Sequence, residues 1–342
     1  TVVDPDQGES GVASVEMTGR VNSNTDDAGT AELGGLTVNA NGTYTFNVAN
    51  AAVNYLATGE TITQTYTVTT TDGSTETFDV VITGTNDAAT VGDASKDLDE
   101  TDVALTTSGT ISISDADDGE AQVQAFTNAA GDNGYGTFTV DADGNWSFTA
   151  NSAFDELNAG DEITDTITVT SADGTDTGVI TVKITGTNDA ATVGDASKDL
   201  DETDVALTTS GTISISDADD GEAQVQAFTN AAGDNGYGTF TVDADGNWSF
   251  TANSAFDELN AGDEITDTIT VTSADGTDTG VITVKITGTN DAATITTTDS
   301  AVTENDALTT LTDSGTLTVV DPDQGESGVA SVEMTGRVNS NT

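Results

Sequence analysis

The amino-acid sequence predicts an all-β protein, a tandem array of seven-stranded Greek-key sandwiches placed end to end. Three observations carry this prediction: an identical internal repeat as long as a small β domain, short segments of alternating apolar and polar residues, and Asp-Gly turn signals between those segments. The chain has 342 residues, which is enough for three ordinary domains.

The internal repeat sets the domain organisation. Ile82–Thr192 recurs unchanged as Ile184–Thr294, 102 residues further along, and Thr318–Thr342 repeats Thr1–Thr25. Because the chain starts without Met and ends inside a repeat, we expect it to be a segment of a longer repetitive protein. The expected segments are a divergent sandwich without its first strand at residues 1–87, two identical sandwiches at 88–189 and 190–291, and the incomplete start of a fourth at 292–342.

Within the identical unit, seven short segments fit β-strands. Alternation is clearest in the last two, where Ile167 and Val169, and then Ile180 and Val182, are separated by polar residues. Strands at this spacing indicate an immunoglobulin-like sandwich, here without the disulfide of antibody domains because the chain has no Cys. The predicted strands are Lys96–Thr101, Gly109–Ser114, Gln122–Thr127, Gly136–Asp141, Asn145–Thr149, Ile163–Thr170 and Gly178–Thr185.

Turn residues and aromatic residues complete the expected domain. Asp143-Gly144 and Asp173-Gly174 predict hairpin turns of type I′, in which both central residues need φ > 0. Ser152–Leu157 is the one segment that fits a helical turn. The aromatic residues expected between the two sheets are Phe126, Phe138, Trp146 and Phe148.

The charge of the chain is extreme. Sixty Asp and Glu face six Lys and Arg, which gives a net charge of −54. Nucleic acid and direct contact with an anionic membrane surface are excluded because their phosphates would be repelled. Such self-repulsion opposes compaction unless cations neutralise it, although an acidic surface can also serve solubility alone. The absence of Cys and His excludes disulfides and thiolate or imidazole metal sites.

Three acidic elements recur around the junctions between repeats, and their oxygens are the ligands that Ca²⁺ prefers. One is an Asn-Asp pair in the linker, the second an Asp-x-Asp loop after the second strand, and the third a Glu that ends the first strand. We expect the linker and the Asp-x-Asp loop at one end of a domain and the Glu at the other. The candidate ligands are Asn86, Asp87, Asn188, Asp189, Asn290 and Asp291; Asp4, Asp6, Asp115, Asp117, Asp217, Asp219, Asp321 and Asp323; and Glu100, Glu202 and Glu304.

The divergent repeat separates these elements from ordinary turns. It keeps the Asp-x-Asp and Asn-Asp elements, whereas Asp141-x-Asp143-Gly144-Asn145 becomes Asn39-x-Asn41-Gly42-Thr43, which keeps a turn and loses the charge. We therefore interpret the latter as a turn despite its likeness to the start of an EF-hand loop. The alternative for the junction elements is that they are solvated loop acids and Asx-turns.

The closing string Thr-Gly-Thr-Asn-Asp-Ala, the Asp-Ala-Asp-Asp-Gly-Glu loop and the terminal hairpin resemble the VCBS/cadherin-like repeats of giant bacterial RTX adhesins. The resemblance covers the whole chain, with Ala where that family usually continues into Pro. It implies calcium-stabilised, immunoglobulin-like extender modules that project a ligand-binding tip from a Gram-negative cell for attachment and biofilm formation. It also implies an extracellular location at the bacterial surface, reached by type I secretion.

The expected function is therefore a non-catalytic, calcium-stiffened extender, a monomeric rod whose partners are calcium ions and neighbouring repeats. An enzyme is not expected, because the sequence lacks His, Cys and any nucleophile or phosphate motif, and identical copies suit length better than catalysis. One alternative is direct binding of a surface or glycan through the threonine row Thr61, Thr63, Thr65, Thr67 and Thr69. Another is homophilic association through sheet edges, which the charge opposes.

Overall fold

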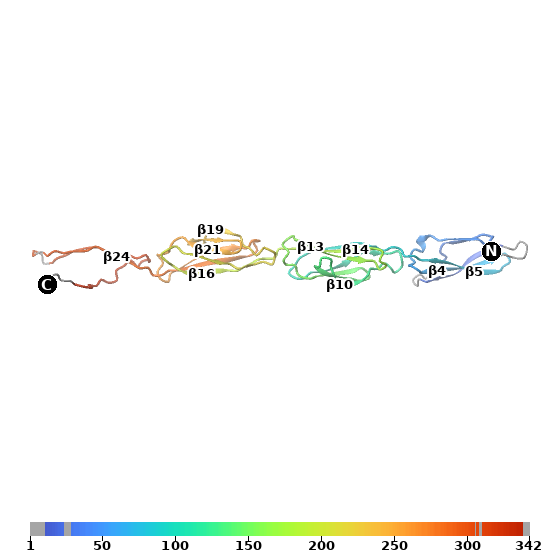
Figure 1. The fold of residues 1–342 in the computed structure, drawn as a ribbon, viewed down its shortest axis with the longest axis horizontal. Helices are drawn as coiled ribbons and strands as arrows, with labels where there is room; N and C mark the ends of the chain where they lie inside the picture. Colours follow the sequence, from blue (N-terminus) through green and yellow to red (C-terminus); the bar gives the residue numbers. More distant parts are fainter. Residues whose placement is uncertain (1–10, 24–28, 305, 308–309, 338–342) are drawn as a thin grey trace. The chain divides into compact units, whose positions relative to one another are not determined.

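The computed structural model describes residues 11–23, 29–304, 306–307 and 310–337. The chain divides into two compact units, Thr1–Thr187 and Asn188–Thr342, and each is described by itself (Figure 1). The first unit holds two β-sandwiches, called here the first sandwich (β1–β5) and the second sandwich (β6–β14). The second unit holds the third sandwich (β15–β23) and a terminal strand pair (β24 and β25).

The second sandwich consists of a four-stranded and a three-stranded sheet. The larger sheet has the order β10-β11-β12-β8, and the smaller has the order β13-β14-β7 with β7 parallel to β14. A short pair, β6 with β9, closes one edge. The strands are β6 Thr90–Val91, β7 Ala94–Asp99, β8 Thr106–Thr110, β9 Ile113–Ser114, β10 Phe126–Ala130, β11 Gly136–Val140, β12 Asn145–Ala150, β13 Glu162–Thr170 and β14 Thr177–Thr185.

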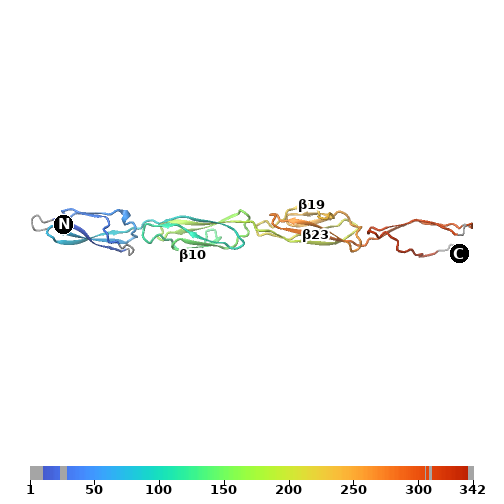
Figure 2. The same cartoon turned by 180° about the vertical axis from the view of Figure 1, so that it is seen from behind.

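The third sandwich repeats this arrangement. Its layers are visible in Figure 1, where β19 and β21 lie in one sheet and β16 in the other, and from behind in Figure 2, where β19 and β23 lie in opposite layers. The strands are β15 Thr192–Val193, β16 Ala196–Asp201, β17 Thr208–Thr212, β18 Ile215–Ser216, β19 Phe228–Ala232, β20 Gly238–Val242, β21 Asn247–Ala252, β22 Glu264–Thr272 and β23 Thr279–Thr287.

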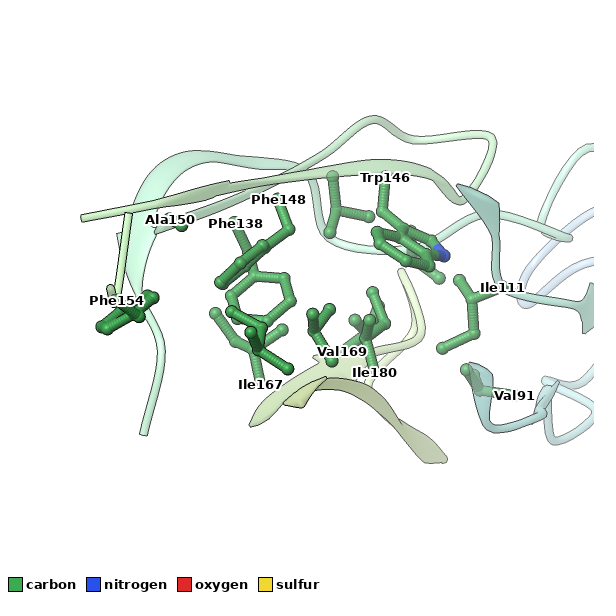
Figure 3. Packing of buried hydrophobic residues seen from close by; sticks show 14 residues of the cluster. Val91, Ile111, Phe138, Trp146, Phe148, Ala150, Phe154, Ile167, Val169 and Ile180 are labelled. Atoms are coloured by element: carbon green, nitrogen blue, oxygen red, sulfur yellow. The ribbon is translucent and has the colours of Figure 1, made fainter. Parts of the chain in front are cut away.

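The core lies between the sheets, as the alternation predicts. Phe138 and Phe148 are at most 1% exposed, and their ring centroids are 4.8 Å apart. Figure 3 shows them facing Ile167, Val169 and Ile180 of the opposite sheet. Trp146 is also buried, whereas the fourth predicted aromatic residue, Phe126, is only partly buried at the edge of this cluster.

The seven predicted strands correspond to β7, β8, β10, β11, β12, β13 and β14, but three of them differ in their bounds by two residues or more. The predicted strand Lys96–Thr101 is placed two residues too late, because β7 runs from Ala94 to Asp99. The predicted strand Gly109–Ser114 breaks after Thr110, because β8 pairs with β12 while β9 pairs with β6. The predicted strand Gln122–Thr127 is placed too early. Val123 forms an isolated bridge to Ser171, which directly follows β13 of the smaller sheet, and the ladder with β11 starts only at Phe126. A strand that changes sheets along its length leaves no mark in local periodicity.

The Asp-Gly turns lie where the sequence predicts them, but their type is different. Gly144 has a φ of 79°, whereas Asp143 has a negative φ. The Gly144 N–H donates to the carbonyl of Asp141, and the Asp141 N–H donates to that of Asn145. This is a type I turn followed by a left-handed glycine, so the prediction of type I′ is wrong. The predicted helical turn Ser152–Leu157 is reduced to one i→i+3 bond, from Leu157 N–H to Phe154 carbonyl.

The first sandwich has a smaller described framework. One sheet has the order β1-β4-β5 and the other is the pair β2-β3. Its core centres on Val53, Leu56 and Ile62. The elements are β1 Val12–Asn22, β2 Gly35–Val38, β3 Tyr44–Asn47, the 3-10 helix η1 Asn50–Ala52, β4 Thr61–Thr70 and β5 Thr75–Thr83.

The terminal strand pair consists of β24 Thr294–Thr297 and β25 Leu317–Val320, which run antiparallel. The pair follows the third sandwich directly through the linker that carries Asn290 and Asp291. Within the described part of the chain, no helix has the length and apolar character needed to cross a membrane.

Candidate metal centre

The second unit brings the predicted acidic elements together after the third sandwich. Glu202 directly follows β16, and the linker residue Asp291 follows β23. Because β16 and β23 are parallel neighbours, both strands end at the same edge of the sheet. Glu202 therefore lies with the linker that closes its own domain, at the end opposite to the domain's own Asp-x-Asp loop.

Hydrogen bonds fix these carboxylates. Glu202 is 2% exposed. Its Oε2 accepts two hydrogen bonds from Thr289, one from the N–H at 3.2 Å and one from the hydroxyl at 3.1 Å. The Asp291 N–H donates to Asp323 Oδ2 at 3.0 Å, and the Asp323 N–H donates to Asp321 Oδ1 at 3.1 Å. The linker and the following Asp-x-Asp loop are thus joined through backbone-to-carboxylate bonds.

Four carboxylate oxygens at this junction are buried without a hydrogen-bond partner among the described residues. They are Glu202 Oε1, Asp257 Oδ1, Asp291 Oδ2 and Asp323 Oδ1. One carboxylate oxygen each from Glu202, Asp257 and Asp291 lies within 4.8 Å of the others. Burying like charges this closely is costly unless a cation neutralises them. Hard carboxylate oxygens in this number fit Ca²⁺, and an open pocket of about 480 Å³, lined in part by Asp204 and Asn290, lies beside them.

The surroundings raise the pKa of Asp291 above its ordinary value. Burial is the largest cause, followed by the negative charges of Glu202, Asp204, Asp323 and Asp257. A carboxyl group whose neighbours are all negative holds its charge only at a cost, and a bound cation removes that cost. The electrostatics of the site thus point to the same ligand as its unpartnered oxygens.

A related arrangement joins the first and second sandwiches. The Asp87 N–H donates to Asp117 Oδ2 at 2.9 Å, and the Asp117 N–H donates to Asp115 Oδ1 at 2.9 Å. Asp117 Oδ1 and Asp115 Oδ2 are buried without a partner among the described residues. Burial raises the pKa of Asp117, and the charges of Asp115, Asp87 and Glu60 raise it further. Asn86 binds Asp173 through its amide nitrogen at 3.0 Å.

One backbone contact recurs at both junctions. The Asp118 N–H donates to the carbonyl of Tyr55 at 2.9 Å, and the Gln324 N–H donates to that of Glu258 at 3.3 Å. Asp118 and Gln324 each follow the second Asp of an Asp-x-Asp loop. The loop of the later domain is therefore bonded to the loop that precedes β4 or β22 in the earlier domain.

The other predicted ligands fall into three groups. In the second unit, the Asp189 N–H donates to Asp219 Oδ2 at 2.9 Å, the Asp219 N–H donates to Asp217 Oδ1 at 3.1 Å, and Asn188 binds Asp275. In the first unit, Glu100 is 2% exposed and accepts from the Thr187 hydroxyl at 3.0 Å. Glu304 is exposed, unlike its counterparts Glu100 and Glu202, and Asp4 and Asp6 lie outside the described residues.

Sequence reasoning missed Asp257, which sits in the loop before β22. Its counterpart Asp155 belongs to the segment predicted as a helical turn. The strand pairing could have identified Asp257. Because β22 and β23 are antiparallel, residues before β22 lie beside residues after β23. The Gly262 N–H indeed donates to the carbonyl of Gly288 at 3.0 Å. Glu120, close after the Asp-x-Asp loop of the second sandwich, is a further acidic residue outside the predicted set, and burial together with the charge of Asp117 raises its pKa.

The threonine row of β4 is engaged within its own sheet. The Thr65 hydroxyl donates to Asp79 Oδ1 at 2.7 Å, and the hydroxyls of Thr18 and Thr67 lie 2.9 Å apart. Thr61, Thr63 and Thr65 are half-buried because β4 lies between β1 and β5. These contacts favour a structural role for the row.

Protons are expected to compete with calcium at the junction of the second unit. Since the folded-state pKa of Asp291 is raised, this group favours the fold below its ordinary pKa and loses that contribution as pH rises through the raised value. In chelator, stability should therefore fall as pH rises through this window. With calcium, the midpoint of a calcium titration should move to higher concentration as pH falls from about 7 to about 5. Calorimetric titration at the two pH values checks this, and an unchanged midpoint contradicts it.

Comparisons with known proteins agree with this architecture. The model of the bacterial cadherin-like domain matches residues 86–186 and 188–288. No curated protein matches the chain. Such domains are extracellular-type structural or adhesion modules and are typically non-catalytic.

Among solved structures, the chain is similar to extracellular cadherin domains 1–4 of protocadherin gamma B7, with 13% identity, 91% of this chain and 76% of that chain covered, and a TM-score of 0.38. It is also similar to the human desmocollin-1 ectodomain, with 12% identity, 91% of this chain and 60% of that chain covered, and a TM-score of 0.33. For Drosophila N-cadherin EC1–4 the identity is 15%, the coverage is 75% of this chain and 64% of that chain, and the TM-score is 0.35. The chain spans less than two thirds of the latter two. Two adjacent matches to one family model account for more than half of the residues, and the chain belongs to the bacterial cadherin-like domain family.

Proposed function

We propose that this chain is a non-catalytic extender segment of a bacterial surface adhesin, stiffened by calcium at the junctions between its repeats. The observation that carries the proposal is the group of buried carboxylate oxygens on Glu202, Asp257, Asp291 and Asp323 that have no hydrogen-bond partner in the described part of the chain. Lys285 of the third sandwich does not neutralise this group, because its ammonium group binds Glu264 at 3.1 Å. Calcium bound there would join the end of one domain to the linker and the first loop of the next.

The charge of the chain gives calcium a second role. Residues 88–189 carry 20 acidic residues and two lysines, a net charge of −18 for one repeat. In low calcium this repulsion opposes compaction, which suits export of an unfolded chain by type I secretion. Extracellular modules bind calcium with dissociation constants of about 10⁻⁴–10⁻³ M, so the calcium outside a cell would fold and stiffen the repeats by mass action.

Identical tandem copies support an extender more than a binding module. A part whose useful property is length can repeat one domain without change, and its distal ligand-binding region then lies elsewhere in the adhesin. The proposed site of action is therefore the outer surface of a bacterium, where the segment holds that region away from the cell for attachment and biofilm formation.

Small-angle X-ray scattering during a calcium titration tests the proposal. We expect calcium to convert a flexible ensemble into a particle of fixed maximum dimension, with a midpoint of about 10⁻⁴–10⁻³ M, while magnesium at the same concentration has little effect. The matched control is Glu258→Gln, which removes a charge from an exposed side chain of the same junction. Asp291→Asn should raise the midpoint and Glu258→Gln should not. Identical scattering in calcium and in chelator would refute the calcium mechanism.

A further inference from the structure

The smaller sheet of the second sandwich ends in an edge strand, β7. Among the described residues β7 pairs with β14 alone, and the six residues Ala94–Asp99 keep an unbroken parallel register with residues 180–185. The Glu100 N–H donates to the Thr185 carbonyl, so by the alternation of a strand the N–H of Asp97 points away from β14. A regular strand with unpaired main-chain groups is a template for pairing with another chain.

The edge strands β13 and β10 are protected by the chain itself. β13 is the second edge of the smaller sheet, and neighbouring segments cover it: the Gln124 N–H donates to the Thr170 carbonyl at 2.9 Å, and the Asp132 N–H donates to the Thr166 carbonyl at 2.8 Å. β10, an edge of the larger sheet, carries a bulge with Asn128 at a φ of 51°. Covering segments and bulges both prevent pairing at an edge. In the described part of the chain, β7 has neither of them.

Lys96 occupies a position on β7 that faces the core. Its register partner is Val182, which is 1% exposed, and its neighbours on the same face, Ala94 and Leu98, pack against the core. Lys96 itself is exposed. Since successive side chains point to opposite faces of a strand, the aliphatic part of Lys96 starts on the inner face, and its ammonium group reaches water past the open edge of the sandwich.

Lys96 is one of the few positive charges of the chain. Residues 88–189 hold 20 acidic residues and two lysines, and Lys96 is one of the two. The third sandwich repeats the arrangement, with Lys198 on β16 opposite Val284, which is 1% exposed. An outward charge such as that of Asp97 stays in water whether or not β7 is paired. An inward charge is enclosed when a second strand closes the edge, and enclosing an ammonium group is costly.

We propose that Lys96 and Lys198 keep the edges of β7 and β16 unpaired, so that the sandwiches do not join edge to edge with those of a second copy of the chain. If two copies of β7 paired antiparallel with both cores on one side, core-facing residues would lie opposite core-facing residues. In the two registers that overlap most, Lys96 lies opposite either Lys96 or Leu98 of the second copy. Both registers confine the ammonium groups of the two copies within the joined core.

The net charge of the chain does not make these lysines redundant. A charge of −54 also repels a second copy, but salt and bound cations weaken that repulsion. The cost of enclosing an ammonium group remains when the surface charge is screened. The protection therefore acts under the conditions in which calcium is bound, and it goes beyond the extender function because it does not depend on any calcium ligand.

Sedimentation velocity of the full chain over a range of concentrations tests the proposal, in calcium and separately in chelator with about 1 M salt. Lys96→Val with Lys198→Val places an apolar side chain that suits strands at both inward positions. We expect this variant to self-associate with a dissociation constant at least about 10-fold lower than that of the unchanged chain. The matched control is Lys183→Val with Lys285→Val, which removes the same charge from the outward face of the adjacent strand and should sediment like the unchanged chain.

Two further variants identify the edge as the interface. Lys96→Glu with Lys198→Glu keeps a charge at the inward positions and should remain monomeric. Asp97→Pro and Asp199→Pro, added to the valine variant, remove an N–H from each free edge and should return that variant to a monomer. The proposal is overturned if the valine variant sediments like its control, if the glutamate variant associates, or if the proline substitutions leave the association unchanged. None of these results bears on calcium binding at Glu202, which the scattering titration tests separately.

Discussion

Replacing Glu202 by Gln is expected to change the stability of the third sandwich in opposite directions with and without calcium. In calcium the variant loses a ligand of the proposed site, and at a concentration 100-fold above the dissociation constant an intact site contributes about 2.7 kcal/mol. In chelator the same variant removes one of several buried like charges and should be more stable, by on the order of 1 kcal/mol. The hydrogen bonds from Thr289 can persist, because the amide oxygen of Gln accepts as the carboxylate oxygen does.

A stability change of opposite sign in calcium and in chelator distinguishes a calcium ligand from a carboxylate that only stabilises the fold. Urea unfolding of the full chain provides the measurement, with Trp146→Phe introduced so that the fluorescence of Trp248 reports on the third sandwich alone. Glu258→Gln is the matched control, because it makes the same chemical change on an exposed side chain near the site. If Glu202→Gln destabilises equally in calcium and in chelator, the residue stabilises the fold only through Thr289 and the calcium proposal fails.

The fold was largely predictable because each buried strand carries its own signal. Alternation in Gly178–Thr185 fixes which side chains face the core, and Ile180, Val182 and Ile184 are all at most 2% exposed. Alternation does not predict the sheet to which a segment belongs. The segment 109–114 changes partners at Ile111, and only the pairing of β8 with β12 and of β9 with β6 determines where it breaks.

The candidate site was predictable where its residues recur in recognisable motifs. The Asp-x-Asp loops and the Asn-Asp linkers are such motifs. The structure joins them through hydrogen bonds that the N–H groups of Asp87 and Asp291 donate to a carboxylate of the Asp-x-Asp loop. Asp257 has no such motif, since it reaches the site through the antiparallel pairing of β22 with β23. Long-range topology, which periodicity does not encode, decides the position of that carboxylate.

A buried carboxylate with a different role lies on β13. Asp165 is 2% exposed and occupies an inward position between Ile163 and Ile167. Its Oδ1 accepts from the N–H groups of Asn133 at 2.9 Å and Thr166 at 3.0 Å, and its Oδ2 accepts from Gly136 N–H at 2.9 Å. These bonds attach the loop between β10 and β11 to the opposite sheet. In contrast to the junction carboxylates, both oxygens have partners, so Asp165 needs no cation.

Asp165→Ala is therefore expected to destabilise the second sandwich by at least about 3 kcal/mol, with or without calcium, because three backbone donors lose a charged acceptor inside the protein. Asp132→Ala is the control. That residue lies in the attached loop, binds the hydroxyl of Thr166 at 2.8 Å and is exposed, so its loss should cost about 1 kcal/mol or less. Urea unfolding with Trp248→Phe isolates the fluorescence of Trp146 in the affected sandwich, and the identical third sandwich is left unchanged. Equal losses for the two variants would show that the loop is held by its backbone contacts to β13, such as the bond from Asp132 N–H to the carbonyl of Thr166, and that the buried carboxylate is dispensable.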